Sequence, residues 1–178
     1  MSLMSPGLRK AALTAHVTSS LGWFGSVTAF LALAIVGLRS TDAGMVRASY
    51  IAMDVTAWTV IVPLCALTLV TGAVQSLGTT WGMFRHYWVI AKLVLTVPAS
   101  AILLLHMRPI SHLANVAAAG PMTADDERRL RIQLVANAGA ALFVLIVTTV
   151  LSIYKPRGLT PYGQRKQRAE RQPVMDES

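Results

Sequence analysis

Four long apolar runs constrain this chain more than any other feature of its sequence. Residues 12–38, 55–77 and 132–154 contain no formally charged side chain, and residues 87–107 contain only Lys92. A helix of ~20 apolar residues spans the ~30 Å hydrocarbon layer of a bilayer. Backbone polar groups inside lipid must be paired within the segment, so each run is expected to form a helix. The sequence therefore predicts an all-α polytopic membrane protein, folded as an up-and-down four-helix transmembrane bundle.

The expected organisation is one membrane domain flanked by two basic tails. Four spans use most of the 178 residues, so no separate soluble domain fits. Arg9 and Lys10 resemble the start of a signal peptide, but the following run is too long for a signal h-region and is expected to be a retained first span. The predicted segments are an N-terminal tail at 1–11, a membrane domain at 12–154 with spans at about 12–38, 50–77, 81–107 and 124–154, and a disordered C-terminal tail at 155–178.

Local helix signals set the ends of the last two spans. Thr80 is expected to cap the third span, which should stop near Met107, just before Pro109. The pair Gly120-Pro121 then breaks the chain. Thr123 is a good N-cap for the fourth helix, because the acidic residues that follow it favour a helix N-terminus. That helix would measure roughly 46 Å at 1.5 Å per residue, which is longer than the bilayer is thick.

The basic charge of the chain indicates contact with anionic lipid headgroups rather than with nucleic acid. The formal net charge is +8, and the basic residues lie in loops and tails beside apolar spans. With four spans, both termini share one side, and the Lys and Arg residues divide nine to six in favour of that side. The positive-inside rule therefore predicts that both termini are cytoplasmic. A homo-oligomer is compatible with the sequence, which identifies no partner protein.

Several classes of chemistry find no support in the sequence. Cys65 is the only cysteine, so a thiolate zinc site, a C-x-x-C-H haem attachment and an intrachain disulfide are excluded. The chain has neither a nucleophile-elbow motif nor a Gly-rich phosphate loop. We therefore expect a protein that is not an enzyme.

Two histidines near the cytoplasmic side are candidate ligands for a b-type haem. His16 lies early in the first span and His86 early in the third, at matching depths if these spans are neighbours. Haem b needs axial nitrogen ligands from opposite helices. His106 lies ~30 Å along the helix from His86 and could not share that haem. The alternative is that His86 is an interfacial residue and that the small residues of the first span form an ordinary helix contact.

Methionine and histidine residues near the opposite side form a second candidate site. Thioether and imidazole groups suit copper, especially Cu(I). No Met-x-x-Met or His-x-His spacing focuses these residues, and methionine is also an ordinary apolar filler. The candidate metal residues are His106, Met53, Met107 and His112, with Met45 and Met122 nearby in the sequence.

Three further polar residues lie within or near the spans, where such side chains are costly. Asp54 enters the second span near Arg108 and is expected to be neutralised in an ion pair. Lys92 lies close enough to the interface to extend its amine toward the headgroups. Asn137 is expected to hydrogen-bond to another helix.

Two stretches resemble known membrane protein families. His16-Val-Thr-Ser-Ser-Leu-Gly-Trp-Phe-Gly25 resembles the opening of the copper resistance D type membrane domain. Ser76-Leu-Gly-Thr-Thr-Trp-Gly-Met-Phe-Arg-His-Tyr-Trp-Val-Ile-Ala-Lys-Leu93 is similar to a motif of small four-span bacterial membrane proteins of unknown function, of actinobacterial type. Together they cover roughly residues 12–107. The resemblance implies a small four-span bundle in a bacterial cytoplasmic (inner) membrane. Four residues are motif positions without an assigned role: His16, Arg85, His86 and Lys92.

The sequence leaves three functional hypotheses open. The first is a non-catalytic membrane protein that binds haem b or a related metal centre through His16 and His86. The second is a copper-handling component that uses the Met and His residues of the other side. The third is a cofactor-free scaffold or accessory subunit.

Overall fold

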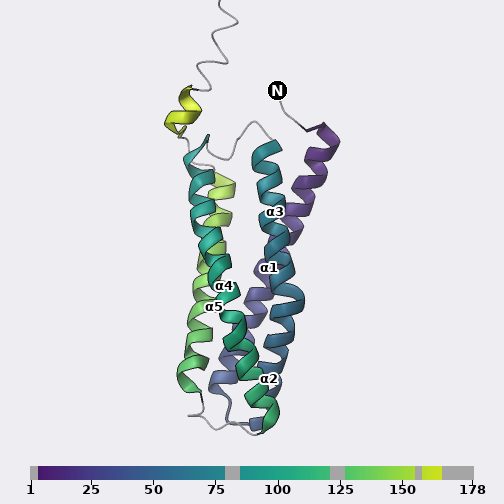
Figure 1. The fold of residues 1–178 in the computed structure, drawn as a ribbon, viewed down its shortest axis with the longest axis vertical. Coiled ribbons are helices and arrows are strands. Elements are labelled where there is room, and N and C mark those ends of the chain that lie inside the picture. The colour runs from purple at the N-terminus through teal and green to yellow at the C-terminus, as the bar shows by residue number, and fades with distance from the viewer. Residues whose placement is uncertain (1–3, 79–84, 121–126, 155–157, 166–178) are drawn as a thin grey trace, which may run out of the picture.

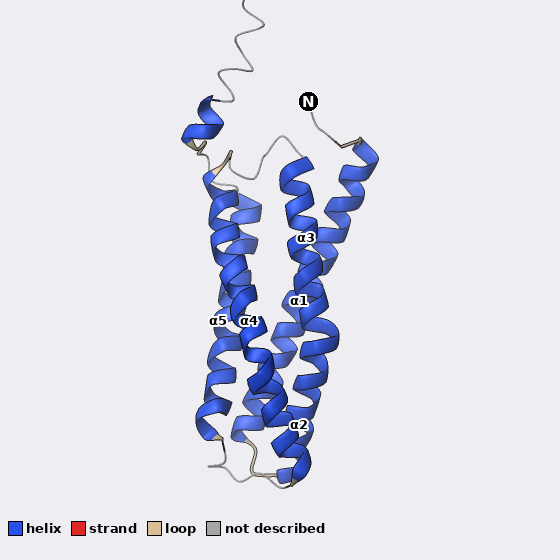
Figure 2. Cartoon of the chain, in the orientation of Figure 1, coloured by secondary structure: helices blue, strands red, loops and turns tan. Residues whose placement is uncertain are grey.

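Four helices long and apolar enough to cross a membrane run side by side along the molecule (Figures 1 and 2). The computed structural model describes residues 4–78, 85–120, 127–154 and 158–165. Its elements are α1 (Pro6–Arg39), α2 (Ala43–Thr56), the π-helical turn η1 (Ala57–Ile61), α3 (Val62–Gly78), α4 (Tyr87–Ala119) and α5 (Arg128–Tyr154). The segments α2, η1 and α3 form one continuous span. The predicted all-α four-helix bundle is confirmed, and the chain is a multi-pass membrane protein.

Short polar side chains set the ends of the first two spanning helices. Ser5 Oγ accepts a hydrogen bond from the Leu8 amide, and Pro6 occupies the first helical position, so α1 begins at Pro6 rather than at residue 12. After α1, the Asp42 carboxylate accepts a 2.9 Å hydrogen bond from the Gly44 amide and caps α2. These caps explain why both helices extend beyond their apolar runs.

The second span contains one π-helical turn where a proline interrupts its hydrogen bonds. Pro63 has no amide hydrogen to donate, and the amide of Val62 bonds to the carbonyl of Ala57, five residues back. The wider turn lets the helix pass the proline and continue to Gly78.

Helix α4 continues through Pro109, which corrects the predicted end of the third span near Met107. The helix contains both Pro98 and Pro109 and reaches Ala119. Beyond Pro109 it buries Ile110, Leu113, Ala114 and Ala117 against the rest of the bundle. Burial of these side chains offsets the cost of an interior proline, which is about 3 kcal/mol.

Parts of the predicted boundaries lie outside the described residues. Thr80 and Thr123, the predicted N-caps of the last two spans, fall in 79–84 and 121–126. As described, α4 starts at Tyr87 and α5 at Arg128. Residues 158–165 belong to the tail that was predicted to be disordered, and they fold onto the start of α4 instead.

That folded segment is held by backbone hydrogen bonds. The Thr160 amide donates to the Arg85 carbonyl at 3.0 Å, and the Tyr87 amide donates to the Gly158 carbonyl at 3.4 Å. Thr160 Oγ1 then accepts from the Gly163 amide at 3.0 Å and caps a helical turn over residues 161–165. The segment therefore satisfies an amide at the N-terminus of α4 that would otherwise have no partner within the helix.

The helices are arranged so that α1 and α4 lie diagonally across the bundle. Helix α1 packs on α2, α3 and α5, whereas α4 packs mainly on α2 and α5. The expectation that the first and third spans are neighbours is therefore wrong. An up-and-down bundle places consecutive helices side by side, which leaves the first and third across the diagonal.

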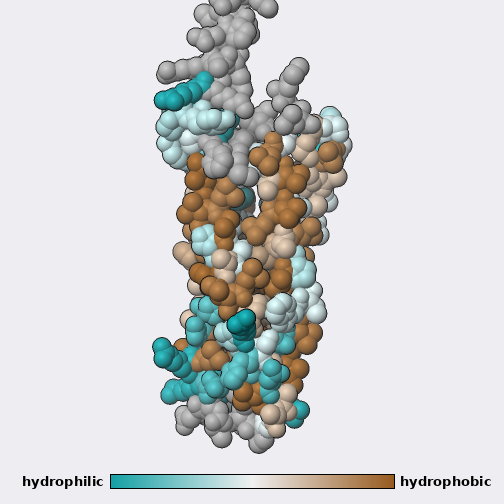
Figure 3. All heavy atoms as spheres, viewed as in Figure 1, coloured by the Kyte–Doolittle hydropathy of each residue, from teal (hydrophilic) through white to brown (hydrophobic). Residues whose placement is uncertain are grey.

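Both ends of the described chain lie at the same end of the bundle, here called the terminal end (Figure 1). The α1–α2 connection, the C-terminal end of α4 and the N-terminal end of α5 lie at the other end, here called the connection end. On the face in Figure 3, hydrophobic side chains dominate nearer the terminal end and hydrophilic ones gather toward the connection end. A 33-residue helix such as α4 is ~50 Å long, so the bundle extends beyond a ~30 Å hydrocarbon layer.

Candidate ligand-binding site

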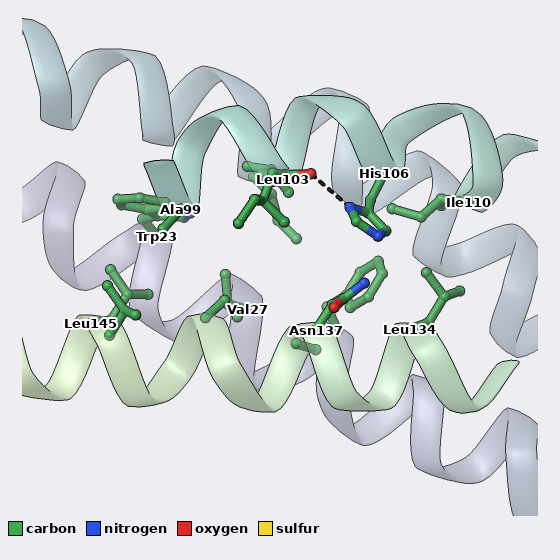
Figure 4. Close-up of a pocket in the computed structure, with 15 residues that line it drawn as sticks. Trp23, Val27, Ala99, Leu103, His106, Ile110, Leu134, Asn137 and Leu145 are labelled. Atoms are coloured by element: carbon green, nitrogen blue, oxygen red, sulfur yellow. Dashed lines mark hydrogen bonds between the residues drawn. The ribbon is translucent and has the colours of Figure 1, made fainter. Parts of the chain in front are cut away.

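A partly enclosed apolar cavity of about 70 Å³ lies between α1, α4 and α5, near the middle of the bundle (Figure 4). The helix positions that face it recur every three or four residues, which places them on one side of each helix. Three of them are alanines, which leave space between the larger side chains. The lining consists of Trp23, Val27 and Phe30 of α1, Ile61 of η1, Ala99, Ile102, Leu103, His106 and Ile110 of α4, and Leu134, Asn137, Ala138, Ala141, Val144 and Leu145 of α5.

His106 enters this cavity with both ring nitrogens already bonded. Its Nδ1 lies 2.8 Å from the Ile102 carbonyl, which can only accept, so Nδ1 carries the hydrogen. In the neutral ring Nε2 is then an acceptor, and the Gln133 amide nitrogen donates to it at 3.2 Å. These two bonds fix the ring between α4 and α5 and leave no nitrogen lone pair for a metal ion unless Gln133 moves.

Unlike the ring nitrogens of His106, two polar atoms of other lining residues have no protein partner among the described residues. They are the indole Nε1 of Trp23 and the amide Nδ2 of Asn137, and both are buried. Trp23 as a whole is only 4% exposed. The expectation that Asn137 bonds to another helix therefore does not hold for its Nδ2 atom. A third atom of this kind, Thr68 Oγ1, belongs to α3 and does not line the cavity.

The cavity reaches the side of the bundle, which faces lipid in a membrane-spanning protein. Ile102, one of the lining residues, is 49% exposed on the outside of α4. A lipid-soluble molecule could therefore enter sideways, and the cavity wall that it meets is almost entirely apolar.

The structure does not bring His16 and His86 together. His16 Nδ1 lies 3.0 Å from Thr71 Oγ1 on α3, and its ring sits against Gly72. Because Thr71 Oγ1 donates its own hydrogen to the Leu67 carbonyl at 2.7 Å, His16 Nδ1 is the donor. His86 lies at the start of α4, where its backbone pairs with Leu159. The two residues stand on diagonal helices and contact different neighbours.

Of the four residues proposed for copper, the two methionines lie in one hydrophobic core cluster and the two histidines lie outside it. Met53 of α2 and Met107 of α4 are 0% and 2% exposed and belong to the hydrophobic core. His106 faces the cavity, whereas the exposed His112 lies 3.5 Å from Glu127. Among the residues that the structure describes, no three side chains of the types His, Cys, Asp or Glu gather at one site that could hold a metal ion.

Asp54 and Lys92 are held by hydroxyl groups of other spans. Asp54 Oδ1 accepts a 2.6 Å hydrogen bond from Ser111 on α4, and it has no ion-pair partner among the described residues. Lys92 Nζ donates to Ser152 near the end of α5 at 2.7 Å and lies 5.8 Å from the centre of the Trp88 ring. The amine therefore extends toward the terminal end of the bundle, as expected for a lysine near the interface.

Arg131 is a buried residue that the sequence did not single out. It is 1% exposed, its Nε donates to Tyr50 Oη at 2.8 Å, and its Nη2 donates to the Gly37 carbonyl. It thereby joins α5, α2 and α1 toward the connection end. Arg131 lies three residues before Leu134, which is buried, so both side chains lie on the inward face of α5. This spacing is the sequence signal from which burial of the arginine could have been predicted.

Comparison with known protein families, curated proteins and solved structures finds no match to this chain. The resemblance to the copper resistance D type domain and to small actinobacterial-type membrane proteins therefore stays a prediction.

Proposed function

We propose that this four-span membrane protein binds a small lipophilic molecule in the cavity between α1, α4 and α5. The observation that carries the proposal is the position of the cavity, which lies midway along the spans and is bounded by apolar side chains. Ligand pockets in proteins are concave, mostly apolar and supplied with a few polar groups, which describes this lining.

The energetics of packing support occupancy by a ligand. Protein interiors are close-packed, and a cavity costs ~24 cal/mol for each Å³ of its volume. The 70 Å³ between these helices thus corresponds to roughly 2 kcal/mol of lost stability. A molecule that fills the space recovers the lost contacts, and Ala99, Ala138 and Ala141 keep the space open.

Binding rather than catalysis fits the groups at the cavity. The only imidazole in its lining, His106, has both nitrogens engaged by protein groups. The lining residues include no carboxylate, thiol or hydroxyl that could act as a nucleophile. The proposed role is therefore that of a membrane carrier, receptor or accessory subunit that holds its ligand unchanged.

The haem and copper hypotheses remain predictions, as does the cofactor-free scaffold. The diagonal placement of His16 and His86 gives the haem hypothesis no support. The copper hypothesis gains none, because Met53 and Met107 lie in the hydrophobic core whereas His106 and His112 contact Gln133 and Glu127 outside it. A location in a bacterial inner membrane with cytoplasmic termini, and contact with anionic headgroups, also remain proposals. The orientation and the headgroup contact rest on the distribution of Lys and Arg residues in the sequence, and the bacterial inner membrane rests on the resemblance alone.

The proposal can be tested with a lipophilic quencher of tryptophan fluorescence. In a protein with Trp58, Trp81 and Trp88 changed to Phe, Trp23 is the only reporter, and it is shielded from bulk lipid. We expect 1-bromooctane to quench Trp23 saturably in lipid nanodiscs. Ala138→Leu fills the cavity and should weaken this quenching several-fold, whereas Ala140→Leu, at an exposed position of α5, should not. Equal quenching in the two variants would contradict the proposal.

A further inference from the structure

The interior of the bundle becomes polar on the terminal side of the cavity. In α1, Trp23 lines the cavity, and Ser19, which is buried, lies four residues nearer the terminal end. In α5, Leu145 lines the cavity, and buried Thr148 follows three residues later. Each of the four spans places a buried hydroxyl group beside or beyond the cavity in this way: Ser19 in α1, Thr68 in α3, Ser100 in α4 and Thr148 in α5. A ligand made only of hydrocarbon does not explain this change.

The edge of the bundle between α3 and α4 is loosely packed. Helix α4 packs on α2 and α5 but only loosely on α3, which continues the same span as α2. Toward the terminal end, α1 and α3 diverge from α4 and α5 (Figures 1 and 2). Because this edge faces lipid in a membrane-spanning protein, it offers a sideways entrance from the bilayer to the polar part of the interior.

Lys92 places a positive charge inside this polar region. Its side chain is half-buried, and its Nζ donates to Ser152 of α5 at 2.7 Å. Its charge also acts on His16, which belongs to the diagonally placed helix α1. The amine therefore lies toward the interior of the bundle, at the level where an interfacial lysine meets lipid headgroups.

The charge of the terminal end favours an anionic ligand. The described residues there carry five basic side chains, namely Arg9, Lys10, Arg85, Lys92 and Arg165. The carboxylates of the described side chains all belong to the half nearer the connection end, and they are Asp42, Asp54 and Glu127. A surface or cleft of one sign attracts ligands of the other sign.

Thr68 contributes a buried hydroxyl group that has no partner among the described residues. Its Oγ1 forms no hydrogen bond there, and the side chain is 9% exposed. Thr68 lies three residues from Cys65, whose thiol is 3.2 Å from Ser100 Oγ on α4, so it lies on the face of α3 that is turned toward α4. A buried hydroxyl group without a partner is costly, and a ligand oxygen that accepted its hydrogen would offset that cost.

The two polar groups and the cavity lie in a fixed order along the bundle. Measured from the contact between Cys65 and Ser100, Thr68 lies ~5 Å and Lys92 ~12 Å nearer the terminal end, at 1.5 Å per residue. The near end of the cavity, at Ala99, lies ~10 Å deeper than Lys92 along α4. Half of a ~30 Å hydrocarbon layer is ~15 Å, so an acyl chain that starts near Lys92 reaches the cavity.

We infer that the ligand is an anionic phospholipid whose phosphate binds Lys92, whose acyl carbonyl accepts from Thr68 and whose chain enters the cavity. This inference rests on the proposed function and specifies its ligand class. From the interface inward, such a lipid presents its phosphate, then its ester carbonyl, then its chain. The order matches that of Lys92, Thr68 and the cavity, and the second acyl chain stays in the bilayer.

Native mass spectrometry with added lipids tests the inference on the unchanged protein. Phosphatidylglycerol and phosphatidylcholine with identical acyl chains differ in net charge, because choline neutralises the phosphate. We expect phosphatidylglycerol to bind roughly tenfold more tightly, the effect of one hydrogen bond between charged groups. Equal binding of the two lipids would overturn the inference.

Variants of Lys92 test whether the preference arises at the proposed position. Lys92→Gln should weaken phosphatidylglycerol binding roughly tenfold and leave phosphatidylcholine binding unchanged. Lys92→Arg should keep most of the preference because it keeps the charge. Lys10→Gln removes the same charge from an exposed position of α1 at the same end, and it should have no effect. A preference that survives Lys92→Gln would contradict the inference.

The ester contact has its own test. Thr68→Val keeps the shape of the side chain and should weaken binding of ester-linked phosphatidylglycerol roughly fivefold, the effect of one neutral hydrogen bond. Ether-linked phosphatidylglycerol, which has no carbonyl, should bind both proteins equally. Thr28→Val, at an exposed position of α1, is the control. Loss of both lipids to the same extent in Thr68→Val would contradict the carbonyl contact.

Two further results separate failure of the inference from failure of the proposed function. If palmitate binds more tightly than phosphatidylglycerol and depends on Lys92, a free fatty acid is the ligand and the phospholipid inference is wrong. If the lipids bind without regard to Lys92 or Thr68 but are lost in Ala138→Leu, the inference fails and the cavity is still a binding site. If Ala138→Leu changes the binding of no lipid, the proposed function fails as well.

Discussion

Arg131 and Tyr50 are joined across α5 and α2 by a 2.8 Å hydrogen bond from the guanidinium Nε to the phenol oxygen. The guanidinium carbon also lies 5.5 Å from the centre of the Tyr50 ring, within the range of a cation–π interaction. Both side chains are almost fully buried. A buried arginine is tolerated only when hydrogen bonds replace its lost hydration, so this contact should matter for stability.

Removing the phenol oxygen should therefore destabilise the bundle. Tyr50→Phe keeps the ring but leaves the Arg131 Nε without this partner, at an expected cost of about 1–3 kcal/mol. Thermal unfolding in detergent measures the change, and Tyr162→Phe is a matched control because Tyr162 is exposed. An equal melting temperature for the two variants would show that the Arg131–Tyr50 bond contributes little.

Gly37 should tolerate no side chain. A Cβ atom at this position would lie 2.9 Å from Cζ of Tyr50, inside the same contact. Gly37→Ala should therefore lower the free energy of unfolding by about 1–3 kcal/mol, as overpacking of a core does. Gly25→Ala lies in the same helix, where a Cβ atom would meet nothing within 4 Å, and it should be neutral or slightly stabilising. A reversed order of the two melting temperatures would contradict the packing described.

The segment at 158–165 should detach from α4 when Gly163 is replaced. A Cβ atom at Gly163 would overlap the backbone oxygen of Arg85, which cannot move aside as the flexible end of a side chain could. In Gly163→Ala we expect faster hydrogen exchange at the amides of Thr160 and Tyr87, which bond across this contact. Gly139→Ala is the control, because a Cβ atom at that position of α5 would meet nothing within 4 Å. Unchanged exchange in Gly163→Ala would mean that the segment is not held there.

The haem hypothesis makes a prediction that reconstitution can test. If His16 and His86 are axial ligands of haem b, replacing either with Ala should produce five-coordinate haem or its loss, visible in the absorption spectrum. His106→Ala should leave that spectrum unchanged. The copper alternative predicts the opposite dependence, with copper uptake sensitive to His106 and Met53 and indifferent to His86. A protein that takes up no added haem would end the first hypothesis.

The fold was largely predictable because the bilayer imposes simple rules on sequence. Apolar runs locate the four spans. In lipid, a chain of this pattern can pair its backbone polar groups only by forming helices. The end of α4 was less predictable. Pro109 predicts a helix end locally, but packing of Ile110 and Leu113 in the core overrides it. Such packing depends on the tertiary structure and has no local signature.

The candidate site was only partly predictable. Asn137 and His106 stood out as polar residues within or near apolar spans, which are rare for energetic reasons. That they line one cavity follows from the rotation of α4 and α5 about their axes, which periodicity alone does not define. The expected pairing of His16 with His86 required α1 and α4 to be neighbours, and the diagonal arrangement removes that basis.

The most direct test of ligand binding is native mass spectrometry of the protein extracted from its own membrane. We predict that the protein retains a lipophilic molecule of defined mass, that Ala138→Leu loses it, and that Ala140→Leu keeps it. Two results would contradict the claim that the cavity between α1, α4 and α5 is a binding site. The unchanged protein and both variants would retain the same adducts, or none of the three would retain any adduct.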